Sequence, residues 1–149
     1  MKLVFSTFLI VALLCNLIWI SWTDLRTRII TNRAIFMTAL LILLFGYILW
    51  GKIFIFPAII SLFIGFIMFM LNIIGAGDIK LISVLMLAVP PEEIISFLFF
   101  ITVVGAVIAL IGLIIDRAAT KQKGIPYGIA IVGGFIINFS SNILTNFYY

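Results

Sequence analysis

Six long apolar runs, separated by short polar connections, dominate this chain of 149 residues. An α-helix needs about 20 mainly apolar residues to cross a bilayer, with a range of about 17–25. Five of the six runs reach that length. Moreover, 66% of the residues are hydrophobic and only 9% are charged, against about 45–50% and about 25% in soluble domains. The sequence therefore predicts an integral membrane protein, an all-α bundle of about six transmembrane helices, at residues 3–22, 34–50, 53–74, 79–89, 94–115 and 125–145.

The composition excludes several kinds of chemistry. The chain has no histidine and a single cysteine, Cys15. Histidine-based catalysis, a disulfide within the chain and a Cys/His zinc cluster are thus excluded, and we expect neither a metal nor a cofactor. The net charge of +4 comes from basic residues in short connections, which indicate membrane orientation rather than a nucleic-acid partner. Lys2 precedes an apolar run that is too long for a signal peptide, so the run is expected to be a retained first helix.

The fourth run, residues 79–89, is short, because eleven residues of helix rise only about 16 Å. It could span the bilayer with its flanks, or form a re-entrant half-helix. If all six runs span, one side receives seven basic residues and the other side two; if the fourth does not, the split is four against five. The positive-inside rule favours six spans, with both termini outside the cytoplasm. The seven basic residues on the cytoplasmic side would be Arg26, Arg28, Arg33, Lys80, Arg117, Lys121 and Lys123.

Two aspartates, Asp24 and Asp78, lie at the ends of apolar runs. A carboxylate at a bilayer boundary is costly to desolvate and is usually functional. The predicted topology places both at the cytoplasmic face, contributed by the first and fourth spans. Two carboxylates a few Å apart cannot easily both be charged, so the pair is expected to titrate as a unit. One ionised and one protonated carboxyl group are what an aspartic protease needs to activate water and to bind the scissile carbonyl.

The residues around the aspartates fit this chemistry, although the aspartates themselves also have simpler explanations. Gly75 and Gly77 would shape the loop before Asp78 and permit close approach of a substrate. Arg26, Arg28 and Lys80 could tune the charge of the pair or fix helix ends. Taken alone, Asp78 could be the N-cap of its helix, and Asp24 could be an interfacial residue that pairs with Arg28. Two further polar residues in the apolar runs, Asn16 and Asn72, are expected to form interhelical hydrogen bonds.

Taken together, three blocks resemble the bacterial type IV prepilin leader peptidases, polytopic aspartic proteases of the inner membrane. Residues 24–32, Asp-Leu-Arg-Thr-Arg-Ile-Ile-Thr-Asn, resemble the first-aspartate block of that family. Residues 75–80, Gly-Ala-Gly-Asp-Ile-Lys, are similar to its Gly-x-Gly-Asp block. Residues 125–130, Ile-Pro-Tyr-Gly-Ile-Ala, with Gly-Gly at 133–134, resemble its final-helix block. The resemblance implies that Asp24 and Asp78 are the catalytic pair.

The same resemblance implies a substrate and a location. The substrate would be a prepilin or pseudopilin, whose short basic leader is cut at the cytoplasmic face of the membrane, before a hydrophobic helix. Long members of the family insert a cytoplasmic domain after the first helix, associated with methylation of the new N-terminus. Here only residues 23–33 separate the first two runs, so N-methyltransferase activity is not expected. The chain is similar to the compact branch that serves Flp-type (tight-adherence) pili, with the archaeal preflagellin peptidases as neighbours.

Residues 1–149 are accordingly predicted to form one membrane-embedded aspartic peptidase domain that supports pilus biogenesis or related secretion. Two alternatives stay open. The same pair of aspartates could cut a transmembrane substrate inside its span, or the chain could be a small transporter or secretion-channel subunit that uses the carboxylates as an ion site. The second alternative fits less well, because both acids lie at one interface rather than at mid-bilayer.

Overall fold

The computed structural model describes residues 2–115 and 124–148. The residues Arg117, Lys121 and Lys123, on which part of the charge argument rests, lie outside these ranges. Six α-helices and one short 3-10 helix form the described part of the chain. They are α1 (Lys2–Thr27), α2 (Asn32–Trp50), α3 (Ile55–Met70), α4 (Ala76–Met86), η1 (Pro91–Glu93), α5 (Ile94–Ile115) and α7 (Tyr127–Tyr148).

Each predicted run contains one helix, but two boundaries that matter for the site differ. The helix α1 continues five residues beyond Trp22, so Asp24 lies within the helix rather than after it. By contrast, α3 ends at Met70, and Asn72 adopts a left-handed conformation with φ 57° in the following turn. The prediction of an interhelical bond from a helical Asn72 is therefore wrong. Asn16 does link two helices, because its Nδ2 donates to Thr38 Oγ1 at 2.8 Å.

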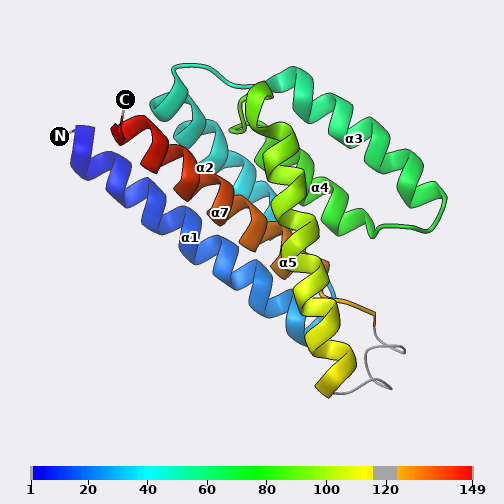
Figure 1. Cartoon of the computed structure of the whole chain (residues 1–149). Coiled ribbons are helices and arrows are strands. Elements are labelled where there is room, and N and C mark those ends of the chain that lie inside the picture. Colours follow the sequence, from blue (N-terminus) through cyan, green and yellow to red (C-terminus); the bar gives the residue numbers. More distant parts are fainter. Residues whose placement is uncertain (1, 116–123, 149) are drawn as a thin grey trace.

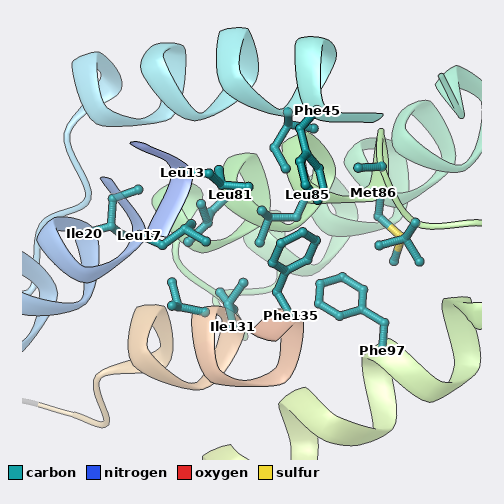
Figure 2. Packing of buried hydrophobic residues seen from close by; sticks show 14 of the residues in the cluster. Leu13, Leu17, Ile20, Phe45, Leu81, Leu85, Met86, Phe97, Ile131 and Phe135 are labelled. Carbon is teal, nitrogen blue, oxygen red and sulfur yellow. The ribbon is translucent and has the colours of Figure 1, made fainter. Parts of the chain in front are cut away.

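The short helix α4 lies inside the bundle. It packs against α2, α3 and α7, while α7 also packs against α1 and α5 (Figure 1). Apolar side chains from α1, α2, α4, α5 and α7 meet in the core, where the labelled side chains of α4 and α7 face each other (Figure 2). Leu81 and Leu85 of α4 are fully buried. A helix of eleven residues can thus be stable because its neighbours, rather than lipid or water, cover most of it.

In the part of the chain that the structure describes, two helices are long and apolar enough to cross a membrane, one over Val4–Thr27 and one over Pro91–Ile115. Three shorter apolar helices accompany them, at Asn32–Ile48, Ile55–Met70 and Tyr127–Ser141. The outward faces of α3 and α5 are apolar, with Phe56 75% and Ile114 83% exposed. Apolar surface of this extent is unfavourable in water and suits a lipid environment. The number of spans and the side on which the termini lie stay predictions.

The chain turns sharply at the end of the bundle that carries the aspartates. The helix α1 ends where Arg28 takes a left-handed conformation, with φ 57°, and donates its backbone N–H to the carbonyl of Asp24. After three more residues, Thr31 caps α2 by accepting a hydrogen bond from the backbone N–H of Ala34. In Figure 1 the C-terminus of α1 and the N-termini of α2, α4 and α7 lie at the same end of the bundle.

Candidate active site

Asp24 lies in the last turn of α1 and is a buried acidic side chain, 5% exposed. Its carboxylate points to the N-terminus of α7, where the backbone N–H of Gly128 donates to Oδ2 at 2.8 Å. The backbone N–H of Ile129 also favours the charged form of the same carboxylate. The first N–H groups of a helix have no partner within the helix and bind anions readily. A residue 104 positions away in the sequence therefore fixes the orientation of Asp24.

Gly128 permits this contact because it has no side chain. A Cβ at residue 128 would lie 2.8 Å from Oδ2 of Asp24, and 3.0 Å from both its Cβ and its Cγ. Atoms of real side chains essentially never approach a Cβ below 3.0 Å. Glycine is thus the residue that lets α7 place its N-terminus directly on the Asp24 carboxylate.

Asp78 lies in the first turn of α4, three residues after the N-cap Gly75. The backbone N–H of Gly75 favours the charged form of its carboxylate, and Asp78 holds the position from which an acidic residue reaches back to the N-cap in a capping box. A Cβ on Gly75 would lie 3.0 Å from Oδ2 of Asp78. Asp78 is only partly buried, and its side chain lines a large apolar cavity. It is therefore held at one end of its helix while remaining accessible from that cavity.

The bundle brings the two aspartates together. They come from α1 and α4, at opposite ends of a stretch of 55 residues, yet they lie near enough for the charge of Asp24 to act on Asp78. At the same time, the Asp24 carboxylate accepts a hydrogen bond from the backbone N–H of Gly128, and the backbone N–H of Gly75 favours the charged form of Asp78. The two acidic groups therefore lie at the same end of the bundle, where the charge of one affects the other.

The simpler explanations for the aspartates account for only part of this geometry. The N-cap of α4 is Gly75, so Asp78 supports the helix start from within the first turn rather than as its N-cap. Arg28 interacts electrostatically with Asp24, as local pairing predicts. However, Nη1 of Arg28 is buried without a hydrogen-bond partner among the described residues. Neither local role requires the two acids to meet.

The other candidate residues occupy different surroundings. Arg26 stacks on the ring of Trp22, with 4.3 Å from its Cζ to the ring centroid. Lys80 is exposed, and its Nζ donates to Oδ1 of Asn32 at 3.0 Å, which ties the start of α4 to the start of α2. Gly77 is helical, without a positive φ. A Cβ there would lie 3.1 Å from Cβ of Ile30, so this glycine serves close packing.

Sequence reasoning missed two contacts of the site and was wrong about the conformation of one glycine. It included Gly128 only as part of the final-helix motif, and did not predict that the backbone N–H of Gly128 donates to the Asp24 carboxylate. It did not pair Lys80 with Asn32, although both belong to the quoted motifs. It also gave the glycines before Asp78 conformational freedom, whereas Gly75 has φ −71° and ψ 146°, an extended conformation. The motif residues were a usable signal, but their partners depend on how the helices pack.

Comparison with known proteins places this chain in a family. A model of the type IV leader peptidase family matches residues 9–110, about two thirds of the chain. The chain belongs to this family. The matched part contains both Asp24 and Asp78 and ends before Gly128. A search of curated proteins gave no match, and neither did a search of solved structures. Membership identifies the chain as a peptidase of a membrane-associated family whose substrates are prepilins.

Proposed function

We propose that the chain is an aspartic endopeptidase of a bacterial cytoplasmic membrane, with Asp24 and Asp78 as its catalytic pair. It removes the basic leader of Flp-type prepilins or pseudopilins at the cytoplasmic face. The observation that carries the proposal is the convergence of Asp24 and Asp78 from α1 and α4, close enough for their charges to interact. Family membership supports the reaction and the class of substrate.

The reaction follows from the chemistry of two neighbouring carboxyl groups. One carboxylate removes a proton from a water molecule while the protonated partner donates a hydrogen bond to the scissile carbonyl. The water oxygen forms a bond to the carbonyl carbon. The C–N bond then breaks, and the leaving nitrogen takes a proton from a carboxyl group. The products are the leader with a new carboxylate and the pilin with a new amino terminus, so one water is consumed for each bond cut.

The remaining candidate residues support the pair rather than react. Gly75 and Gly128 orient the two carboxylates through their backbone N–H groups. Arg28 supplies positive charge beside Asp24, and Lys80 holds the start of α4 against α2. We place Gly77 with helix packing and Arg26 at the surface of the site, where it stacks on Trp22.

The test is co-expression with a Flp-type prepilin, followed by detection of the shortened pilin. Asp24→Asn and Asp78→Asn should each abolish processing, because an amide can neither accept the proton from water nor titrate. The matched control is Glu92→Gln, an exposed acid in η1, which lies between α4 and α5 and away from the site. Each variant should be present in the membrane at the level of the wild type. Retained cleavage in either aspartate variant would contradict the mechanism.

The position of the cut separates this proposal from intramembrane proteolysis. Sequencing the amino terminus of the product should place the cut between the basic leader and the first apolar residue of the pilin. A cut within the apolar helix would instead indicate an intramembrane protease that uses the same pair of aspartates.

A further inference from the structure

We propose that an apolar groove between α3 and α5 receives the transmembrane helix of the substrate, with the scissile bond at the Asp78 end. The inference rests on the proposed function and adds the place where the substrate binds. It starts from a cavity of about 1210 Å³ whose walls are α3 and α5 and whose floor is formed by α4 and the start of α7. The helix α3 packs on α4 and α5 packs on α7, so the two walls belong to different pairs of helices.

The size of the groove suits a helix rather than a small molecule. Pockets for small molecules have volumes of about 300–1,000 Å³, and this groove is larger. Its lining residues on α5 extend from Ile94 to Ala109, about 22 Å of helix at 1.5 Å per residue. The hydrocarbon core of a bilayer is about 30 Å thick. The groove is therefore long enough to contact a helical occupant over most of the thickness of the hydrocarbon core.

The chemistry of the lining also selects an apolar occupant. Among the described residues of the lining, Asp78 alone carries a charged side chain. The hydroxyl groups of Ser61 and Thr102 donate to carbonyls of their own helices, at 2.9 Å in each case, so they place no demand on an occupant. On α5, Ala106 and Ala109 lie in the lining, and small side chains let a second helix approach closely.

The position of Asp78 sets the direction of the occupant. Asp78 stands at the start of α4, and Ile79, Ile82 and Met86 continue the floor of the groove away from it. A substrate that is cut just before a hydrophobic helix must place the start of that helix beside the aspartates. Its helix can then follow the groove, antiparallel to α5, since α5 ends at the same end of the bundle as α4 begins (Figure 1).

Disulfide crosslinking in membranes tests this arrangement, with a Flp-type prepilin as the probe. In a Cys15→Ser background, a cysteine is introduced at Ala106 in the groove or at Val107, which is 50% exposed but outside the lining. Single cysteines are placed along the first 16 residues of the apolar helix of the prepilin. Copper phenanthroline then oxidises pairs of nearby thiols to disulfides, and cleavage is measured in the same samples. We expect crosslinks to Ala106→Cys at least tenfold stronger than those to Val107→Cys.

The groove also predicts a register. Leu98 lies in the lining eight residues before Ala106. The substrate position that crosslinks best to Leu98→Cys should therefore lie about eight residues further into the prepilin helix than the position that pairs with Ala106→Cys, since both helices rise 1.5 Å per residue. The reverse order would overturn the proposed direction and thus the proposal.

The outcomes distinguish this inference from the proposed function. Cleavage with crosslinks equal at Ala106 and Val107, or absent from both, would overturn the groove as the substrate site and indicate that lipid fills it. Groove-specific crosslinks without cleavage would support the binding site and contradict the proposed function. As a second measurement, Ala106→Trp should fill the groove and slow processing at least tenfold, whereas Val107→Trp should process prepilin within about twofold of the wild type. Equal rates in the two tryptophan variants would also overturn the proposal.

Discussion

The contact between Gly128 and Asp24 yields the sharpest prediction about the site. In Gly128→Ala, the new Cβ would lie 2.8 Å from Oδ2 of Asp24, whereas ordinary contact begins at about 3.4 Å. The carboxylate and the N-terminus of α7 must therefore separate by about 0.6 Å or more. Because Asp24 is buried, that movement lengthens or breaks the 2.8 Å hydrogen bond from the Gly128 N–H. The substitution thus displaces a proposed catalytic group without removing it.

The size of the effect follows from two estimates. Loss of a hydrogen bond to a charged group costs about 1.5–3 kcal/mol, which corresponds to about 10–150-fold in rate. Misplacement of a catalytic group by about 1 Å can cost about 100-fold. We expect kcat for prepilin processing to fall about 10–100-fold. KM should change less than about threefold, because Gly128 lies outside the apolar groove that we propose for the substrate.

The assay is a time course of prepilin cleavage with purified enzyme in detergent or liposomes. The matched control is Gly46→Ala on α2, where the new Cβ would meet Cβ of Ala88 at an ordinary 3.4 Å. The control should process prepilin at close to the wild-type rate, and both variants should keep a thermal unfolding midpoint near that of the wild type. If Gly128→Ala cleaves within twofold of the wild type, the contact between α7 and Asp24 has no role in positioning.

Two further predictions concern the start of α4. Gly75→Ala would place a Cβ 3.0 Å from Oδ2 of Asp78. Because the side chain of Asp78 is less buried than that of Asp24 and can move into the cavity, processing should slow only about 2–10-fold. A larger loss of activity in Gly75→Ala than in Gly128→Ala would contradict this reasoning. Lys80→Met and Asn32→Ala should each slow processing about 2–5-fold, because an exposed polar pair contributes up to about 1 kcal/mol. The double variant should be no slower than the more affected single variant, since the two substitutions remove the same 3.0 Å hydrogen bond. Fully additive effects in this double-mutant cycle would exclude that hydrogen bond as the cause.

Much of the fold could be predicted from the sequence, because apolar runs of sufficient length form helices wherever they can bury their backbone hydrogen bonds. The six predicted runs each contain one helix, and Pro57 lies in the first turn of α3, where proline is tolerated. Helix ends were less predictable. The chain between Trp22 and Arg28 has no glycine or proline, so no helix-breaking residue marks where α1 ends. The left-handed conformation of Arg28 that ends α1 depends on the turn into α2.

The candidate site likewise combines residues that the sequence predicts with contacts that only the tertiary structure shows. The sequence by itself determined the two aspartates, the glycines before Asp78 and the basic residues around them, because rare charged groups stand out in a chain that is 9% charged. Tertiary structure alone decided that α7 places the N–H of Gly128 on Asp24, that Asn32 holds Lys80 and that Asp78 opens into an apolar groove. Each of these contacts joins residues on different helices. Which helix faces meet is set by the packing of many side chains at once, and no short stretch of sequence contains that information.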